Sequence, residues 1–490
     1  MQTPEEFLES NGLATATLDR AALIAAFQKE MEAGLAGEPS SLKMIPTYTS
    51  PYGEITKDVP VTVLDAGGTN FRGATVMIPS AGEIRIEHVE KGEMPGAKSY
   101  VSAYDFYAVL ASHVNRCRPY VKDSAIGFCF SYPAEASADG DAKLLMWTKQ
   151  IQAPEIVGQW VGAELTKRLD PKPSKVQVVN DTVATLLAGK AAEKPGQKFS
   201  AYIGFILGTG TNVAYIERND AIKKLTNPPP GAMAVNTESG GFNKIAQSAF
   251  DEAMDRKTSD CGSQRFEKMI AGAYLGRIGL EVFKAAARAG FFSDHAKAAV
   301  LGLGTLESYD LDNFCAKYDN GKPNPLDKVF ADEADRAMAR RLATPVFERA
   351  AILTAVHLAA FIVKTGGGTD PNAPVCVCID GSTYYKTRVV SFPDIVKKEL
   401  DEMLAKRAAA VRRLLPEHLL RAAGVALPKT PTPDGADAVD EADESEGKNL
   451  KNAEDDGAWQ RITIRRPTQR TRSPSAVRRT RGAPSGGSRE

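Results

Sequence analysis

Two stretches of the chain place glycines and hydroxyl side chains at a bend between apolar segments, and the first of them adds a carboxylate. In "VLDAGGTNFRGATV" (residues 63–76) an apolar segment ends in Asp65 and the chain then turns through two glycines. Because glycine has no Cβ, the backbone N–H groups of such a turn can approach an anion closely. A carboxylate at the strand end can hold Mg²⁺, directly or through water. The stretch fits a phosphate-binding hairpin turn, although an ordinary Gly-Gly hairpin has the same pattern.

A second stretch repeats this design. "YIGFILGTGTNVAYIE" (202–217) reads as strand, glycine turn and strand, and a third apolar strand ends in "CIDGS" (378–382). No GxxxxGK[ST] segment occurs, and the first turn returns to a strand instead of opening a helix, so neither common nucleotide fingerprint applies. The three turns follow the order of the two phosphate loops and the adenosine loop in the actin-like ATPase fold. They predict a nucleotide held between two related halves.

Alternating strand and helix patterns must position these turns. Short β-branched or aromatic runs closed by turn residues predict buried strands at 62–67, 72–78, 125–132, 176–181, 201–208 and 375–381. Helical periodicity predicts helices at 19–35, 181–193, 264–290 and 348–368. Asp181 and Thr182 fit a helix start, and Gly366 to Gly368 would stop the last helix. The alternation indicates an α/β protein.

Nine motifs, in order and at similar spacing from about residue 20 to about residue 405, resemble the hexokinase family, the eukaryotic-type glucose-phosphorylating enzymes of the actin-like superfamily. They are "GLAGEPSSLKMIPTY" (34–48), "LDAGGTNFRG" (64–73), "GFCFSYP" (127–133), "MWTKQI" (146–151), "VNDTVATLLAGK" (179–190), "IGFILGTGTNVAYIE" (203–217), "VNTESGGF" (235–242), "QRFEKMIAGAYLG" (264–276) and "CIDGSTYYK" (378–386). The resemblance implies ATP-dependent phosphorylation of a hexose, with glucose the expected sugar, at its 6-hydroxyl as the first step of glycolysis.

The resemblance also implies a role for each matching residue. Asp181 matches the general base for the sugar hydroxyl, and Lys149 would lie near the reacting phosphate or that hydroxyl. The positions that match sugar ligands are Ser131, Thr148, Lys149, Asn180, Asp181, Asn212, Glu238, Gln264 and Glu267. The positions expected around ATP are Asp65, Gly67, Gly68, Thr69, Asn70, Arg72, Gly208, Thr209, Gly210, Thr211, Asp380, Gly381 and Ser382. Asp65 would organise Mg²⁺, most simply through water. Taken singly, each residue is an ordinary surface or capping residue; the constellation carries the prediction.

The expected architecture is a two-domain actin-like ATPase (ribonuclease H-like) fold with a central cleft. Residues 1–54 would form an N-terminal helical segment packed on the large domain, 55–195 a small α/β domain and 196–405 a large α/β domain. Residues 406–490 are expected to be an atypical, disordered tail. Sugar binding should close the cleft, which excludes water as a competing phosphoryl acceptor.

Several positions depart from the family pattern. Tyr132 replaces the second Phe of F-S-F-P, Ala136 falls where a Gln is usual, and Ser239 replaces a Trp. Asn243 and Lys244 replace a Gly-Asp pair. These changes are expected to alter the rim of the sugar pocket. Hexokinases end in a strand and an Asp-Gly-Ser-x-x-Gly-Ala-Ala segment that opens the last helix, whereas nothing similar follows residue 407. A replaced ending, for instance through a shifted reading frame, would remove one adenosine wall.

Composition bounds the remaining possibilities. Formal net charge is zero, which favours neither nucleic acid nor a membrane surface, and the N-terminus has no apolar signal-peptide core. Six scattered cysteines without a CxxC pair argue against a zinc site and favour a reduced, cytoplasmic compartment. Residues 434–456 are acid-rich and 461–490 are rich in Arg, Ser, Thr and Pro. This basic end reads as a solvated tail, with nucleic-acid binding a remote alternative. Partners are then the hexose and ATP, with the chain a monomer or homodimer.

The sequence also leaves two other functions open. A non-catalytic sugar sensor on the same fold is the weaker prediction, because Asp181 is present, but an altered C-terminus could impair the enzyme and leave only sugar binding. An actin-like ATPase or assembly protein is the third, and the predicted sugar ligands argue against it. ADP release that depends on glucose would separate these functions.

Overall fold

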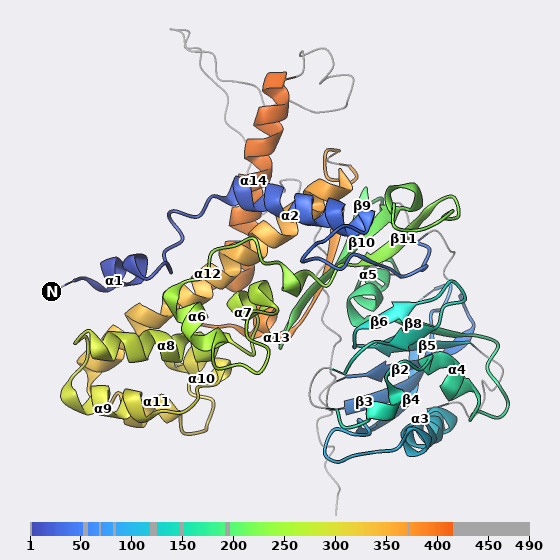
Figure 1. The fold of residues 1–490 in the computed structure, drawn as a ribbon, viewed down its shortest axis with the longest axis horizontal. Helices are drawn as coiled ribbons and strands as arrows, with labels where there is room; N and C mark the ends of the chain where they lie inside the picture. Colours follow the sequence, from blue (N-terminus) through green and yellow to red (C-terminus); the bar gives the residue numbers. More distant parts are fainter. Residues whose placement is uncertain are drawn as a thin grey trace, which may run out of the picture.

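The fold consists of two halves, each built on a five-stranded sheet (Figure 1). The computed structural model describes residues 2–51, 57–67, 70–81, 85–117, 125–147, 151–191, 197–370 and 372–414. Each half has its own large hydrophobic core. The mixed α/β architecture with two related sheets is that of the two-domain actin-like ATPase fold, as the sequence predicted.

The smaller half contains the sheet with strand order β4-β3-β2-β5-β8. Its strands are β2 (Pro60–Ala66), β3 (Asn70–Met77), β4 (Arg85–Glu93), β5 (Ile126–Phe130) and β8 (Val176–Val179). The antiparallel β2–β3 hairpin pairs Asp65 with Arg72, and β2, β5 and β8 are parallel. The remaining elements of this half are α3 (Ala103–Cys117), α4 (Val161–Thr166), η1 (Pro154–Ile156) and the hairpin of β6 (Ala134–Ala136) and β7 (Ala142–Leu144). The carboxyl ends of β2 and β5 therefore lie side by side.

The larger half repeats this connectivity in the strand order β1-β11-β10-β9-β12. Its strands are β1 (Ile45–Pro46), β9 (Ala201–Leu207), β10 (Thr211–Arg218), β11 (Ala232–Asn236) and β12 (Val375–Asp380). An antiparallel β9–β10 hairpin is followed by antiparallel β11, and β12 runs parallel to β9, as β5 does to β2. In the described part of the chain no strand lies beyond β12, where the smaller sheet has β8 as its fifth strand.

Helix α5 (Asp181–Ala191) lies between the two sheets (Figure 1). The prediction placed residues 181–195 in the small domain, but the structure packs α5 on β9, β10 and β12. Gly204 of β9 allows this packing, because a Cβ there would clash with the Thr182 carbonyl and the Leu186 N–H. Helix α5 therefore follows a strand of one sheet and covers the other, and the boundary at residue 195 stays a prediction.

The large half has a helical layer whose central member is α12 (Glu333–Thr365). Further helical elements of the large half are η2 (Asn219–Ala221), η3 (Ser239–Gly241), α6 (Ala249–Asp255), α7 (Arg265–Ile270), α8 (Leu275–Arg288), α9 (Asp294–Gly302), α10 (Ser308–Cys315), α11 (Pro325–Val329) and α13 (Ser382–Lys386). Helix α12 begins well before the predicted residue 348 and contains Pro345. Among the helices of the described residues, α12 alone is long and apolar enough to cross a membrane. Of the apolar 18-residue stretch that meets this criterion, 89% is buried inside the protein.

The helix predicted across residues 264–290 is interrupted. Helix α7 ends at Ile270 and α8 begins at Leu275. Within the break, the Gly272 N–H donates to the Gly208 carbonyl at 2.8 Å and the Ala273 N–H to the Thr209 carbonyl at 3.2 Å. These bonds to another segment replace the helical bonds, so tertiary contacts override the periodic pattern.

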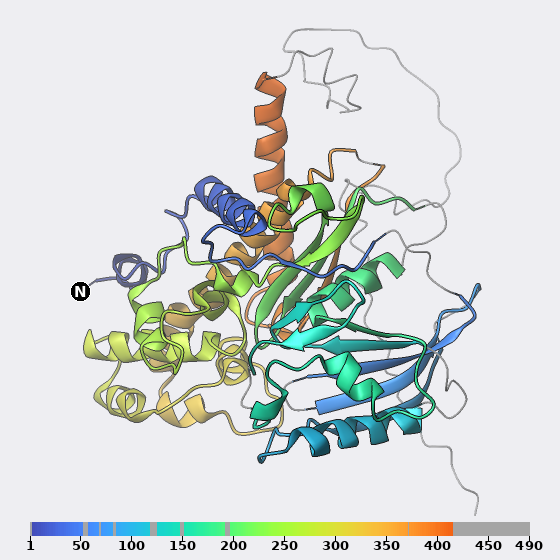
Figure 2. The same ribbon diagram turned by 45° about the vertical axis from the view of Figure 1, so that its right-hand side comes forward.

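Both ends of the described chain pack on the larger half. Helices α1 (Pro4–Ser10) and α2 (Arg20–Ala36) contact α12. Helix α14 (Phe392–Leu414) also packs on α12 and rises from the body in Figure 2. The predicted start of the tail at residue 406 is wrong, since α14 continues to Leu414. Residues 415–490 lie outside the described residues.

Candidate active site

The first predicted phosphate turn closes the β2–β3 hairpin. Arg72 Nη1 and Asp65 Oδ2 form an ion pair of 3.1 Å, with both side chains about half exposed. The Gly67 N–H donates to the Asn70 carbonyl at 3.0 Å, which closes the turn. Gly68 and Thr69 lie outside the described residues. A carboxylate and a guanidinium therefore meet at the solvent-facing base of the turn, where phosphate and Mg²⁺ would need them.

The second predicted phosphate turn, Gly208 to Thr211, closes the β9–β10 hairpin. The Gly208 N–H donates to the Gly210 carbonyl at 2.9 Å, and the Gly208 carbonyl accepts from Thr383 Oγ1 at 2.8 Å as well as from Gly272. Thr209 is exposed at the tip. Neighbouring segments thus hold the base of the turn while its tip faces solvent.

The third predicted turn lies against the second. Gly381 has φ 130°, which favours glycine, and an added Cβ would clash with the Leu207 carbonyl. A Cβ added to Gly208 would lie 3.7 Å from the backbone nitrogen of Ser382. Asp380 and Ser382 are exposed. The structure therefore brings together the turns predicted for phosphate and for adenosine.

Asp181 is the first residue of α5, the helix that follows β8 of the smaller sheet. The Thr182 N–H lies 2.9 Å from Asn180 Oδ1 and 2.8 Å from Asp181 Oδ1, so both side chains cap the start of the helix. Asn180 and Asp181 are half-buried. The capping role and a role at the site are compatible, because Asp181 has a second carboxylate oxygen.

One set of predicted sugar ligands forms a short chain of hydrogen bonds on the larger half. Asn212 Nδ2 donates to Asn236 Oδ1 at 2.7 Å, and Asn236 Nδ2 donates to Glu238 Oε1 at 2.8 Å. Glu238 has φ 53° and ψ 46°, a left-handed conformation that is uncommon for this residue type and often found at functional sites. Asn236 was missed by the sequence analysis, although it lies in the "VNTESGGF" motif.

A second set of sugar ligands surrounds α7. Gln264 occupies the N-cap position of this helix and has a left-handed conformation, with φ 49° and ψ 42°. Glu267 Oε2 accepts from the Thr211 N–H at 3.0 Å, and Tyr274 donates to Glu267 Oε1 at 3.4 Å. A Cβ on Gly240 would lie 3.0 Å from Gln264 Oε1. The glycine therefore lets Gln264 and Glu267 lie beside the second phosphate turn; Tyr274 was also missed.

On the smaller half, Ser131 follows β5 and its N–H donates to the Ala66 carbonyl at 3.3 Å. Ser131 is therefore adjacent to the base of the first turn. Thr148 and Lys149 lie outside the described residues, so their predicted roles stay predictions.

Two of the departures from the family pattern are not at a rim. Tyr132 is only 2% exposed and Ser239 is fully buried. The expectation that these two changes reshape the pocket rim is therefore wrong, because both side chains lie in the interior.

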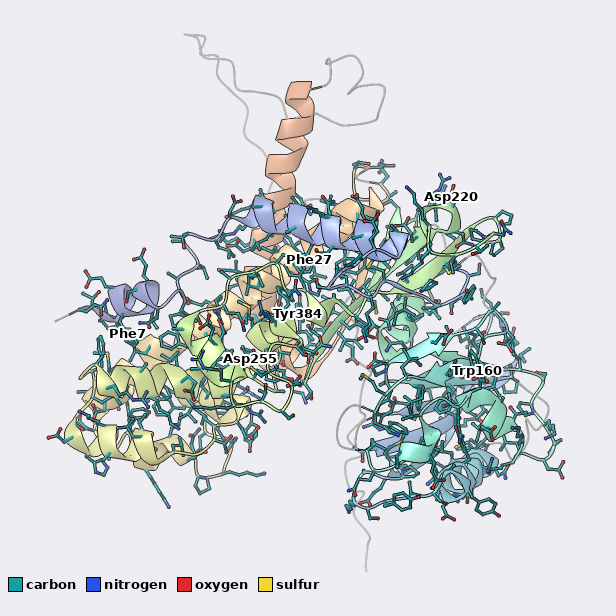
Figure 3. The ribbon with its side chains drawn as sticks, in the orientation of Figure 1. Phe7, Phe27, Trp160, Asp220, Asp255 and Tyr384 are labelled. Atoms are coloured by element: carbon teal, nitrogen blue, oxygen red, sulfur yellow. The ribbon has the colours of Figure 1, made fainter. Side chains whose placement is uncertain are left out.

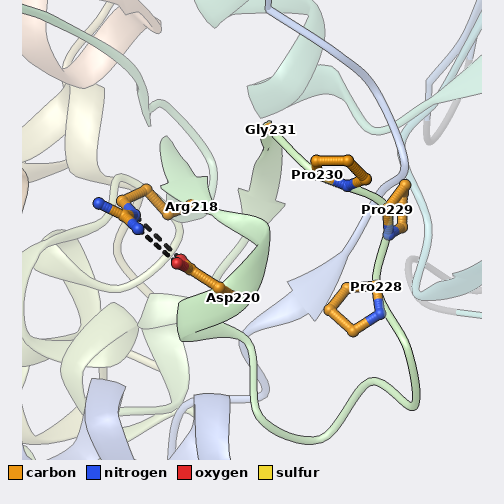
Figure 4. Close-up of a pocket in the computed structure, with 6 residues that line it drawn as sticks. All are labelled: Arg218, Asp220, Pro228, Pro229, Pro230 and Gly231. Atoms are coloured by element: carbon orange, nitrogen blue, oxygen red, sulfur yellow. Dashed lines mark hydrogen bonds and ion pairs between the residues drawn. The ribbon is translucent and has the colours of Figure 1, made fainter.

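A hollow of about 520 Å³ on the larger half is separate from these groups (Figure 4). It is lined by the Arg218–Asp220 ion pair, by three consecutive prolines at 228–230 and by Gly231. Figure 3 shows Asp220, at this hollow, far from Asp255, whose carboxylate accepts a hydrogen bond from Lys268 of α7. None of the lining residues belongs to the predicted site.

Known proteins share both halves of this architecture. Residues 5–191 match one hexokinase family model, and residues 202–419 match a second. Hexokinase-7 of Oryza sativa subsp. japonica is 30% identical over 420 residues, which cover 79% of this chain and 87% of that protein. Hexokinase-2 of Solanum tuberosum is 31% identical over 409 residues, covering 78% of this chain and 81% of that protein.

A solved structure agrees with these relatives. The hexokinase from Schistosoma mansoni complexed with glucose matches with a TM-score of 0.66 at 25% identity, over 82% of this chain and 94% of that one. The family models cover the strands and turns that carry the predicted site in each half. This chain therefore belongs to the hexokinase family and is a hexokinase-type enzyme.

Proposed function

We propose that the protein transfers the γ-phosphoryl group of ATP to the 6-hydroxyl of a hexose, with glucose the favoured sugar. One contact carries this proposal. Glu267, from the predicted sugar ligands, accepts a hydrogen bond from Thr211 of the second phosphate turn at 3.0 Å. Phosphoryl transfer needs acceptor and donor sites that adjoin in this way.

The sugar ligands suit a molecule that offers many hydroxyls and little apolar surface. Asn212, Asn236 and Glu238 supply amide and carboxylate groups in one connected row. Gln264 and Glu267 supply a second such pair beside them. The glucose named with the related Schistosoma mansoni structure supports the choice of sugar.

Asp181 acts as the general base in this proposal. Its Oδ1 accepts from the Thr182 N–H, which fixes the direction of the carboxylate at the helix start. The other oxygen would accept the proton of the sugar 6-hydroxyl as that oxygen attacks phosphorus. A positioned base contributes roughly 10²–10⁴-fold to a rate. Arg72 at the first turn and the exposed Thr209 at the tip of the second turn would bind the phosphate oxygens.

The residues at the first turn fit a Mg²⁺ ion that arrives with ATP. Within the described ranges, no three His, Cys, Asp or Glu side chains converge as a metal site. Mg²⁺ in kinases is commonly held by one or two carboxylates together with substrate phosphates and water. The half-exposed Asp65 supplies that carboxylate. Bound there, the ion would neutralise charge on the phosphates.

Closure of the two halves over the sugar is part of the proposal. Because α5 follows the smaller sheet and packs on the larger one, the start of α5, where Asp181 lies, is one of the places where the chain passes between the halves and would bend on closure. Closure would bring the first turn toward the sugar and exclude water. All six cysteines are free thiols in the structure, which supports a reduced cytoplasmic location. A glycolytic role as a monomer or homodimer, without membrane or nucleic-acid partners, completes the proposal.

Coupled measurement of ADP tests this function. Mg-ATP with glucose should give steady turnover, and Mg-ATP without sugar should give little. Glucose binding by calorimetry without any turnover would instead support the sugar-sensor alternative. ADP release that ignores glucose would support an actin-like ATPase and overturn the proposal.

A further inference from the structure

Tyr132 connects the first phosphate turn to the strand end that carries Ser131. Its hydroxyl donates to the Gly67 carbonyl at 2.6 Å, and the Gly67 N–H donates to the Asn70 carbonyl at 3.0 Å. We propose that Tyr132 is a positioning residue that holds the Gly67 peptide at the base of the first phosphate turn in place for ATP; this inference rests on the proposed function of that turn.

The ring of Tyr132 is held firmly enough to act in this way. It is 2% exposed, with its centroid 4.9 Å from the Phe130 ring and 4.7 Å from the Trp147 ring, and it meets Trp147 edge to face at 87°. Trp147 is itself fixed, since its Nε1 donates to the Ala153 carbonyl at 2.5 Å. An aromatic residue packed on two others has little rotational freedom, so its hydroxyl is presented in one place.

The hydroxyl is suited to a carbonyl partner. Burial, together with the negative charge of Asp65, raises the pKa of Tyr132 well above its usual value. A tyrosine keeps its proton at neutral pH even at its ordinary pKa of about 10, so the hydroxyl can donate, which is what a carbonyl oxygen requires. Phe, the residue usual in the family pattern at this position, would fill the same space but could not form this bond.

The hydrogen bond acts on the turn and not on the sugar. A peptide unit is planar, so a fixed Gly67 carbonyl fixes the direction of the peptide plane at the start of the turn. Asp65 lies two residues before Gly67 on the same strand end. Loss of the hydroxyl should therefore change the binding of ATP, while the ring contacts that support Ser131 remain.

The variant Tyr132→Phe tests this inference. Removing a single hydrogen bond corresponds to about a 2- to 10-fold effect, expected as a rise in KM for ATP. KM for glucose, and the glucose dissociation constant without nucleotide, should change less than about twofold. Tyr132→Leu, which also removes the ring contacts, should raise both KM values.

Tyr107→Phe is the matched control. Tyr107 is a fully buried tyrosine of the same half, and in the described part of the chain its hydroxyl has no hydrogen-bond partner. It should leave both KM values unchanged. An unchanged KM for ATP in Tyr132→Phe, or equal shifts in both KM values, would overturn the inference.

The two proposals fail in different ways. If the unaltered chain shows no glucose-dependent turnover, the proposed function fails, and the dissociation constant for Mg-ATP is then compared by calorimetry. A weaker affinity in Tyr132→Phe alone would still support the positioning role, and equal affinities in all the variants would refute it.

Discussion

Replacing Lys268 with Met removes a buried charge from the helix that presents Glu267. Lys268 is fully buried on α7, and its Nζ lies 2.6 Å from Asp255 Oδ1. It also lies 3.0 Å from Thr258 Oγ1, from the Asp260 carbonyl and from Asp260 Oδ1. One ammonium group therefore ties α7 to the loop that precedes it.

The cost of this change follows from what stays behind. Asp255 is 5% exposed, so its carboxylate would keep only weaker partners such as the Gly262 N–H at 2.9 Å. Removing one partner of a buried ion pair typically costs about 3–5 kcal/mol. We therefore expect Lys268→Met to lower the free energy of unfolding by about 3 kcal/mol or more, and to raise KM for glucose because α7 loses its support.

The pair also has a defined pH dependence. Burial acts to raise the pKa of Asp255, but hydrogen bonds from Lys268 and Gly262 outweigh it, and the pKa in the folded protein is lowered. This contribution to stability is present above the unfolded pKa of about 4 and is lost as pH falls through the lower folded value. Below about pH 4 the difference between Lys268→Met and the unaltered protein should therefore shrink.

Urea unfolding followed by circular dichroism measures this difference. Lys397→Met is the control, because Lys397 pairs with Asp401 at 3.2 Å on α14 while being 53% exposed. Such pairs contribute about 0.5 kcal/mol or less. Adding Asp255→Asn to Lys268→Met should restore part of the loss, since no unpaired charge then remains. If Lys268→Met costs no more than Lys397→Met, the account of α7 is refuted.

Two further substitutions test other parts of the structure. A Cβ in Gly210→Ala would lie 2.5 Å from Glu267 Oε2, so KM for both substrates should rise. In the control Gly302→Ala the new Cβ would meet nothing within 4 Å, and neither KM should change. Equal kinetics in the two variants would contradict the site geometry. Burial lowers the pKa of His357 to about 3. As the pH falls below about 6.5, the unfolded chain therefore binds a proton at this residue and the folded chain does not. The free energy of unfolding should then decrease by up to about 1.4 kcal/mol per pH unit. His357→Leu should flatten this fall, seen as urea midpoints at pH 7.5 and pH 5, and parallel curves would refute the assignment.

The sequence predicted the parts of the fold that local patterns determine. The β2–β3 and β9–β10 hairpins follow from apolar runs that meet at glycines, and both are present. The continuous helix across 264–290 was wrong because Gly272 and Ala273 donate to the second phosphate turn, a contact that periodicity does not contain.

The sequence patterns also could not predict which distant segments pack together. The assignment of α5 to the small domain followed chain order, but close approach at Gly204 places the helix on the other sheet. The continuation of α14 past residue 405 had a local signal, since "AKRAAAVRRLL" is rich in strong helix formers. Asn236 lay within a quoted motif, yet only the structure shows that it bridges Asn212 and Glu238.

The most direct test of the central claim is glucose-dependent ADP production by the full chain and by Asp181→Asn. Asn keeps the oxygen that accepts from the Thr182 N–H at 2.8 Å but cannot take a proton, so the helix start should be preserved. The account predicts turnover in the unaltered protein, a roughly 10²–10⁴-fold loss in the variant and an unchanged glucose dissociation constant. Turnover in Asp181→Asn equal to that of the unaltered protein would contradict it.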